Sequence, residues 1–306
     1  MEPISQVIKD LMNNNPEFAK RMSAVNESLA SDPIEVLTKP SKQCPVMKCD
    51  GAGWIWMKDW SKRHLRNVSD EWKEPCECYE QMMKQRVIDK KLDLSGIPPI
   101  FQDATVASFN PNKYLEADSR ETAIVAKKAA ENLVKNYQAM KNIGKGLYLY
   151  SSIKGSGKTR LASSIANALV KVHGVDLIFI KANDLLSQVK KTYGKESLQT
   201  EDQVIRMFRE VEVLVIDDVS VEKTKETSMT FAEKILYDVT DYRLEHRKVT
   251  IFTSNRTIED LAKVYTEGRV KSRINKMSLE VYMPEESIRD QEAESENAEL
   301  ERMIFG

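Results

Sequence analysis

One short stretch of the chain carries residue types that bind a phosphate chain. Residues 147–159 read LYLYSSIKGSGKT, an apolar strand pattern followed by a glycine-bearing turn and then Lys-Thr. The backbone N–H groups of such a turn, with the positive end of the helix that follows, can surround a triphosphate. Gly155 and Gly157 let the backbone approach closely, Lys158 is expected to neutralise β/γ-phosphate charge, and the Thr159 hydroxyl to bind Mg²⁺. The predicted ATP-binding residues are Gly155, Ser156, Gly157, Lys158, Thr159 and Arg160.

This pattern departs from its consensus at one position. The consensus G-x-x-x-x-G-K-[ST] places glycine at position 152, where this chain has Ser152. Serine does not adopt a positive φ cheaply, so the departure affects how tightly the turn can surround phosphate. The alternative interpretation is a Gly/Ser turn before an ordinary amphipathic helix.

A second stretch predicts the magnesium partner of this turn. Residues 213–216 are apolar and suit a buried strand, and Asp217 and Asp218 follow at its carboxyl end, where such sheets bind ligands. We expect Asp217 to hold Mg²⁺ through water, with Thr159 as the other magnesium residue, and Asp218 to polarise the attacking water. The alternative is a pair of helix-capping residues after a core strand.

A third strand pattern, residues 249–254, ends at Asn255. An amide at this position can orient water near the γ-phosphate, whereas without the other two motifs an ordinary turn asparagine would be favoured.

The four cysteines predict a structural zinc site. They form two close pairs, Cys44 with Cys49 and Cys76 with Cys78, within 35 residues of a 306-residue chain. Four thiolates can enclose a tetrahedral zinc ion, and His64 between the pairs could replace one of them. The segment is short and rich in tryptophan, so a metal would supply much of its folding energy. The alternative is four cysteines without a metal.

The elements that must position these residues follow a strand–helix alternation after residue 96. Strands are predicted at 147–151, 175–181, 212–217, 248–254 and 279–283. Helices are predicted at 4–12, 17–30, 79–92, 119–141, 158–173, 183–193, 201–210, 228–246 and 257–265. Such alternation predicts an α/β fold, a doubly wound parallel five-stranded sheet with helices on both faces.

Length and charge divide the chain further. Net charge is −1, but residues 284–306 hold eight acids and two bases, so the rest carries about +5. We predict a helical, cysteine-rich domain at 1–95, an ATPase domain at 96–283 and a disordered acidic tail at 284–306. No apolar run is long enough for a membrane span, and no signal peptide is evident, so a cytoplasmic protein is expected.

These motifs, in this order, resemble AAA+ ATPases, and more closely the DnaC/DnaI-type replicative helicase loaders and their IstB relatives. The resemblance covers residues 97–289. Its specific parts are the beginning of the ATPase domain, the phosphate-binding turn, the aspartate pair and two later segments. The matching segments are 97–105, 152–159, 217–218, 235–243 with 253–255, and 268–274. It implies an ATPase without a helical lid.

The resemblance also implies residue roles. Asn255 looks like sensor 1, and Arg273 falls where the loaders carry an arginine finger that reaches a neighbouring subunit's nucleotide; Arg269 is the nearby alternative. Arg289 lies near the expected sensor 2 position. The alternative for Arg269 and Arg273 is a solvated basic helix end. The predicted catalytic residues are Lys158, Asp217, Asp218, Asn255 and Arg273.

The implied partners are a hexameric replicative helicase, gripped by the amino-terminal domain, single-stranded DNA, and further copies of the chain. The cysteine segment also resembles the amino-terminal region of these loaders, so Trp54, Trp56 and Trp60 are either helicase contacts or packing around the metal loop. Basic residues give modest support for DNA binding. These are Lys181, Lys190, Lys191, Lys195, Arg243, Arg247 and Lys248.

Two rival functions stay open. An IstB-type transposition helper ATPase would engage a transposase instead of a helicase. The second rival is a nucleotide-binding adaptor that does not hydrolyse ATP. Ser152 is compatible with it, as is Asp218, whose side chain is one methylene shorter than the glutamate that many AAA+ proteins have there. Both residues suggest slow turnover.

Overall fold

The computed structural model describes residues 13, 15–17, 20, 33–62, 68–194, 200–220, 231–265 and 268–305. The predicted helix 4–12, most of the predicted helix 17–30, and His64 lie outside these ranges. The chain divides into a smaller unit, residues 1–87, and a larger unit, residues 88–306. Among the described helices, none combines the length and apolar character needed to cross a membrane.

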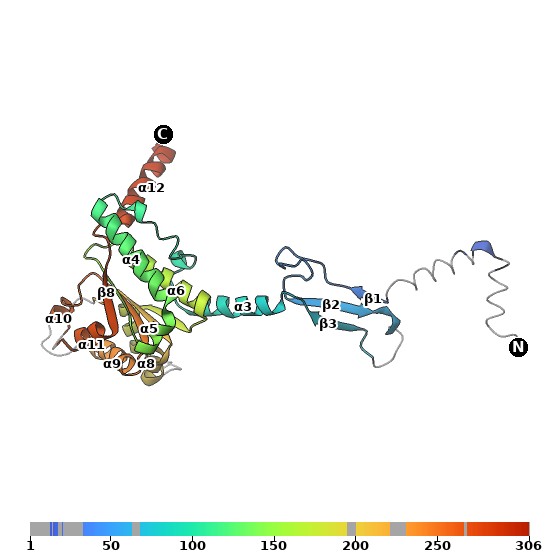
Figure 1. Ribbon diagram of the computed structural model, residues 1–306, viewed down its shortest axis with the longest axis horizontal. Coiled ribbons are helices and arrows are strands. Elements are labelled where there is room, and N and C mark those ends of the chain that lie inside the picture. The colour runs from blue at the N-terminus through green and yellow to red at the C-terminus, as the bar shows by residue number, and fades with distance from the viewer. Residues whose placement is uncertain are drawn as a thin grey trace. The chain divides into compact units, whose positions relative to one another are not determined.

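The larger unit is built on the predicted five-stranded sheet (Figure 1). Its strands are β4 (Gly146–Tyr150), β5 (Leu177–Lys181), β6 (Val213–Asp217), β7 (Val249–Ser254) and β8 (Ser278–Tyr282). The order is β5-β6-β7-β4-β8, and every neighbouring pair is parallel. The carboxyl ends of β4, β6 and β7 therefore meet at one edge, with β7 between the other two.

Helices cover both faces of this sheet. They are α4 (Ala117–Lys135), α5 (Tyr137–Ile143), α6 (Lys158–His173), α7 (Ala182–Lys191), α8 (Glu201–Glu210), α9 (Phe231–Glu245), α10 (Leu261–Val264) and α11 (Arg269–Met277). One further helix, α12 (Ile288–Phe305), buries no side chain against the sheet. Alternate strand residues point to opposite faces. Val213 and Val215 pack with residues of α4 and α6, whereas Leu214 and Ile216 pack with residues of α7, α8 and α9. The doubly wound α/β prediction is confirmed.

The smaller unit contains a sheet that the sequence patterns did not reveal. Strands β1 (Ile34–Val36), β2 (Trp54–Asp59) and β3 (Glu71–Pro75) pair antiparallel in the order β1-β2-β3. Helix α3 (Tyr79–Leu94) follows and runs across the division between the units. Short 3₁₀ turns lie at Trp60–Lys62, Pro99–Phe101 and Pro111–Lys113.

Three predicted elements need correction. The helix predicted at 257–265 is helical only at α10, Leu261–Val264. The single helix predicted at 119–141 is two helices, because Asn136, with φ −103° and ψ 23°, ends α4 and begins α5. The tail expected to be disordered is helical: residues Ile288–Phe305 form α12 without burying any side chain. Its first turn is tied to the phosphate-binding turn, so the larger unit's contacts extend past the predicted boundary at residue 283.

Candidate nucleotide site and cysteine cluster

The phosphate-binding turn has the backbone that its glycines predicted. Gly155 and Gly157 have φ values of 82° and 88°, which side chains rarely adopt. A Cβ at Gly157 would lie 2.9 Å from the Tyr114 hydroxyl, and a Cβ at Gly155 would lie 2.4 Å from the Ser287 hydroxyl. Ser152 is not among the described residues with positive φ, so serine fits this position without backbone strain.

Lys158 lies at the first position of α6 and is 8% exposed. Its Nζ donates hydrogen bonds to the Ser151 carbonyl (3.1 Å), the Ile153 carbonyl (2.7 Å) and the Ser156 hydroxyl (3.2 Å). Burial lowers the pKa of Lys158 to about 8, and the negative charge of Asp218 opposes the shift. The ammonium thus lies inside the turn that a phosphate chain would enter.

Asp217 and Thr159 lie together, as predicted for a magnesium site. The Thr159 hydroxyl donates to Asp217 Oδ1 over 2.9 Å, and Asp217 is 4% exposed at the end of β6. Burial raises the pKa of Asp217, and the hydroxyls of Thr253 and Thr159 oppose this. A carboxylate and a hydroxyl are oxygen ligands of the type that Mg²⁺ prefers, so these residues fit the ion.

Asp218 and Asn255 follow the neighbouring strands β6 and β7. Asp218 adopts a left-handed backbone conformation with φ 55°, and its N–H donates to the Thr253 hydroxyl over 2.9 Å. Asn255 is half-buried. Both lie where the parallel strands end, on the same edge as the phosphate-binding turn, as expected for residues that act on one water.

The segment that follows β8 contacts the phosphate-binding turn. The backbone N–H of Ser152 donates to the Glu285 carboxylate over 3.0 Å, and the Ser152 hydroxyl donates to the same group. The Ile288 N–H donates to the Gly155 carbonyl over 3.1 Å. Arg289 is exposed. A Cβ added at Gly155 would lie 3.0 Å from the Cβ of Arg289, so Arg289 lies beside the phosphate-binding turn.

Arg273 is engaged within its own chain. On α11, its Nε donates to Asp241 Oδ1 over 2.8 Å and one terminal nitrogen to the Tyr237 hydroxyl over 3.0 Å, both on α9. The hydrogen bond to Asp241 raises the pKa of Arg273, which keeps its charge in place. Arg269, one turn earlier, is exposed.

A small cavity lies beside the phosphate-binding turn, with Gly157 in its lining. It is about 30 Å³ in volume. Its lining is Phe109, Asn110, Lys113, Tyr114, Gly157, Arg160 and Ile288. Arg160, predicted to bind nucleotide, thus lines a cavity next to Gly157, and Tyr114 donates from its hydroxyl to the Ser156 carbonyl over 3.0 Å. The sequence analysis did not single out Phe109 or Tyr114, because neither belongs to a spaced motif.

The four cysteines of the smaller unit meet in space. All are buried, and their Sγ atoms lie within 4.8 Å of one another. The Sγ atom of Cys44 lies 3.9 Å from that of Cys76 and 3.6 Å from that of Cys78, and the Sγ atom of Cys49 lies 3.5 Å from that of Cys78. A zinc ion with four Zn–S bonds of about 2.3 Å places its sulfur atoms about 3.8 Å apart, so the cluster fits tetrahedral zinc.

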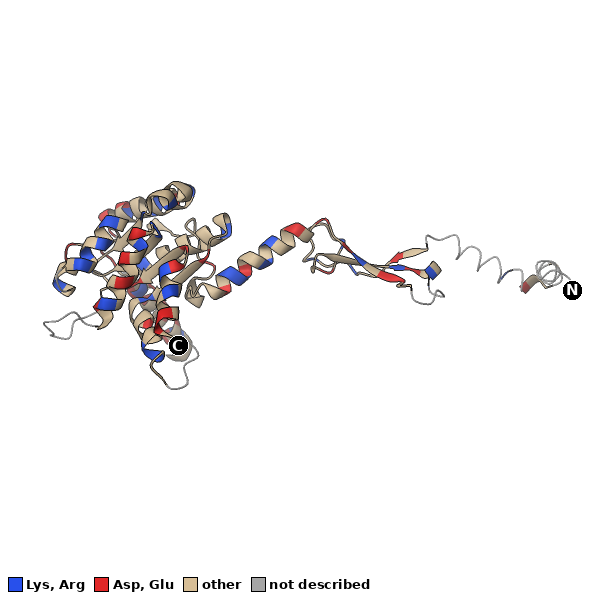
Figure 2. Ribbon diagram, turned by 90° about the horizontal axis from the view of Figure 1, so that it is seen from below, with Lys and Arg blue, Asp and Glu red and all other residues tan. Residues whose placement is uncertain are grey.

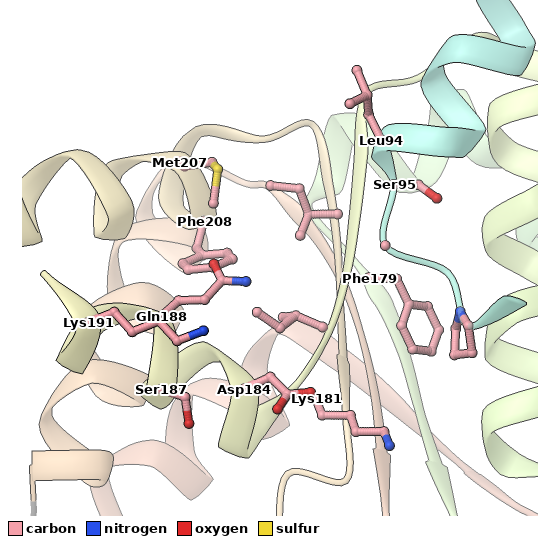
Figure 3. A pocket seen from close by; sticks show the side chains of 14 residues that line it. Leu94, Ser95, Phe179, Lys181, Asp184, Ser187, Gln188, Lys191, Met207 and Phe208 are labelled. Atoms are coloured by element: carbon pink, nitrogen blue, oxygen red, sulfur yellow. The ribbon is translucent and has the colours of Figure 1, made fainter. Parts of the chain in front are cut away.

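A larger cavity, about 510 Å³, lies at the outer edge of β5 (Figure 3). Its polar lining includes Lys181, Asp184, Gln188 and Lys191, and Figure 3 shows Gln188 and Lys191 of α7 reaching toward β5. No residue of the phosphate-binding turn lines it.

The predicted basic cluster needs one correction: Arg243 is fully buried and hydrogen-bonded to backbone carbonyls, so it cannot contact DNA.

Comparison with known proteins identifies the family. The family described as IstB-like ATP binding protein matches residues 79–294, more than two thirds of the chain. The chain belongs to this family. The predicted family is thereby confirmed, and the matched residues of this IstB-like protein include the phosphate-binding turn.

Relatives of this IstB-like protein include a replicative helicase loader DnaC of Buchnera aphidicola subsp. Schizaphis graminum. The two are 27% identical over 216 residues, covering 71% of this chain and 77% of that protein. A crystal structure from Streptococcus pyogenes serotype M3, described as a candidate primosome component, is 26% identical with TM-score 0.50, covering 65% of this chain and 96% of that one. The crystal structure of the DnaC helicase loader, 22% identical with TM-score 0.50, covers 61% of this chain and 99% of that one and shows the shared fold.

Proposed function

We propose that this IstB-like protein is an ATP-dependent loader that binds a hexameric replicative DNA helicase and delivers it to single-stranded DNA in replication initiation. The observation that carries the proposal is the convergence of Lys158, Thr159 and Asp217 at one edge of a parallel sheet. The relatives named replicative helicase loader supply the biological setting of the proposal.

In this proposal ATP acts as a switch. Lys158 exchanges its hydrogen bonds to loop carbonyls for phosphate oxygens, and Thr159 and Asp217 would hold Mg²⁺. The ion supplies charge neutralisation on the phosphates. Asp218 polarises the attacking water and Asn255 orients that water. Charge stabilisation on the phosphates, rather than covalent chemistry, accelerates hydrolysis.

Hydrolysis is completed by a second copy of the chain. Arg273 would reach the nucleotide of a neighbouring subunit, for which it must leave Asp241 and Tyr237. Because an exposed or half-buried ion pair of this kind is worth only about 1 kcal/mol, assembly can release the guanidinium. ATP turnover is therefore slow in the free protein and stimulated by partners.

The smaller unit is the proposed helicase-binding part, within a domain at residues 1–95. Trp56 and Trp60 are 46% and 42% exposed on this unit, which favours a contact role over packing around the metal loop. Trp54 is half-buried and packs against Tyr79 with ring centroids 4.5 Å apart and ring planes tilted by 59°, which favours a structural role. A zinc ion held by the four cysteines would stabilise this small unit.

Single-stranded DNA is proposed to bind along the basic residues near the outer edge of the sheet. Lys181 and Lys191 line the 510 Å³ cavity there. Figure 2 shows basic and acidic residues interspersed over the helices of the larger unit, so DNA binding would rest on a few lysines rather than on a uniformly positive face. Replacing both lysines by alanine should remove about two phosphate contacts, so the slope of log K for DNA binding against log salt concentration should fall in magnitude by about 2.

Co-purification tests the proposal directly. The full chain is used to recover partners from cells that contain candidate helicases, with and without ATP. A replicative helicase recovered in an ATP-dependent manner, lost in Lys158→Ala and kept in Lys171→Ala, is the expected result. Lys171 is an exposed lysine on the same helix α6 and serves as the matched control.

Each rival function predicts a different outcome. Recovery of a transposase in place of a helicase would support the transposition helper. ATP-dependent helicase binding without phosphate release, even with helicase and single-stranded DNA present, would support the adaptor. If Lys158→Ala leaves ATP binding and loading unchanged, the assignment of the nucleotide site is wrong.

A further inference from the structure

The hydroxyl of Thr253 lies between the two aspartates of the nucleotide site. Thr253 Oγ1 donates to Asp217 Oδ1 over 2.6 Å and accepts from the backbone N–H of Asp218 over 2.9 Å. The backbone carbonyl of Thr253 also accepts from the Val219 N–H over 2.9 Å. One threonine thus contacts three consecutive residues at the carboxyl end of the neighbouring strand β6, Asp217 to Val219.

The direction of these hydrogen bonds follows from the chemistry of the groups. A backbone N–H is only a donor, so the Thr253 oxygen must accept from Asp218. An ionised carboxylate is only an acceptor, so the single hydroxyl proton must go to Asp217. Both capacities of the hydroxyl are therefore engaged at once, and no rotation of the hydroxyl can satisfy the two aspartates in another way.

The surrounding structure holds this hydroxyl in one position. Thr253 lies on β7, between β6 and β4, and is 2% exposed. Asp218 has the left-handed φ of 55°, a conformation that costs a non-glycine residue about 1 kcal/mol and needs support. The hydrogen bond from its N–H to Thr253 supplies that support.

We propose that Thr253 is a positioning residue for ATP hydrolysis, whose hydroxyl holds the magnesium-binding carboxylate of Asp217 and the backbone of Asp218 in one hydrogen-bonded unit. The inference rests on the proposed function, because the roles of the two aspartates come from it. Oδ1 of Asp217 accepts from both Thr253 and Thr159, which fixes the plane of the carboxylate before Mg²⁺ arrives. Groups that orient a metal ligand in this way change metal affinity or activity about 10–100-fold when removed.

The test uses the full chain and three variants. Thr253→Val keeps the β-branched shape and removes the hydroxyl, and Thr253→Ser restores it. Thr240→Val is the matched control, because Thr240 is also fully buried and its hydroxyl donates only to carbonyls of its own helix α9. The main readout is the Mg²⁺ concentration that gives half-maximal binding of a fluorescent, non-hydrolysable ATP analogue, and basal phosphate release is measured alongside.

We expect Thr253→Val to need about tenfold more Mg²⁺ and to lose about tenfold in kcat, while binding of the analogue without Mg²⁺ stays as in wild type. Thr253→Ser should return the Mg²⁺ midpoint to near wild type. A merely structural loss would leave the Mg²⁺ midpoint unchanged.

Failure of this inference can be told from failure of the proposed function. Suppose that wild type binds the analogue and that the Mg²⁺ midpoint of Thr253→Val either equals that of wild type or shifts no more than the midpoint of Thr240→Val. The positioning role is then wrong and the proposed function stands. If wild type binds no nucleotide at all, both are overturned.

Discussion

Glu285 holds Ser152, the residue that replaces the first glycine of the phosphate-binding turn. The carboxylate accepts from the Ser152 backbone N–H over 3.0 Å and from its hydroxyl. Glu285 also lies close enough to Lys158 for its charge to favour the ammonium form of that residue. A negative charge therefore lies at the beginning of a turn whose ligand is itself strongly negative.

Removing this charge should strengthen ATP binding. Glu285→Gln keeps an oxygen that accepts from the Ser152 N–H but removes the repulsion between carboxylate and phosphate. Between partly solvated charges this repulsion is worth about 1 kcal/mol, so ATP affinity should rise about fivefold in a calorimetric titration at low salt.

Glu294→Gln provides the control for this substitution. Glu294 is an exposed acid farther along α12, and its loss should leave ATP affinity unchanged. Weaker ATP binding by Glu285→Gln would contradict the repulsion argument and show that Glu285 mainly shapes the turn.

ATP affinity should fall at alkaline pH because of Lys158. Burial lowers the pKa of Lys158 in the free protein to about 8, whereas bound phosphate favours the charged form and raises that pKa. Below pH 8 Lys158 is protonated in both the free and the ATP-bound protein, so ATP affinity does not change with pH. Above pH 8 a proton must be taken up on binding, and the Kd for ATP should rise about tenfold from pH 7 to pH 9.

Arginine offers a check on this pH dependence. Lys158→Arg stays charged throughout this range, so whatever its affinity at pH 7, its Kd should not change with pH. A wild-type Kd that is constant to pH 9 would show that the Lys158 ammonium is not the group that titrates.

The larger unit could be predicted from sequence because its signals are local. Each strand is a short apolar run, and the ends of β4 and β6 carry residues with recognisable spacing. Glu285 and Thr253 could not be assigned in the same way, since their partners lie 133 and 36 residues away and depend on strand order. The antiparallel sheet around the cysteines was also missed, because the half-buried strand Trp54–Asp59 lacks a clean alternation of apolar and polar residues.

Metal removal should unfold the smaller unit selectively. The full chain should purify with one zinc ion, and a strong chelator should change tryptophan fluorescence, because all four tryptophans of the chain lie between residues 54 and 72. Cys76→Ser should lose the metal and show the same fluorescence without chelator. ATP binding by the larger unit serves as the internal control and should persist. Metal-free protein with an unaltered spectrum would argue against zinc.

Arg243 should be essential to the stability of the larger unit. Its guanidinium donates to the carbonyls of Phe208, Arg209, Val211 and Val249 without exposure to solvent. Arg243→Met fills similar space but leaves these carbonyls without donors, and we expect a loss of about 3 kcal/mol or more in the free energy of unfolding. Arg247→Met, an exposed neighbour, should have little effect in the same denaturant titration.

Arg273 should act on a neighbouring subunit's nucleotide. Arg273→Ala is expected to bind ATP normally but to lose about 10³-fold in partner-stimulated hydrolysis, the amount that an arginine finger contributes. Lys158→Ala lacks its own nucleotide but keeps Arg273. Mixing the two inactive variants with helicase and single-stranded DNA should therefore restore part of the phosphate release, because some interfaces then combine an intact nucleotide site with an intact arginine.

The ion pair between Arg273 and Asp241 sharpens this experiment. Asp241→Asn weakens the contact that holds the guanidinium within its own chain, so hydrolysis at low protein concentration should rise if release of Arg273 limits assembly. Arg269→Ala separates the two candidates on α11. If Arg269→Ala abolishes stimulated hydrolysis while Arg273→Ala does not, then Arg269 is the residue that crosses the interface, and the hydrogen bonds of Arg273 to α9 serve the packing of the two helices alone.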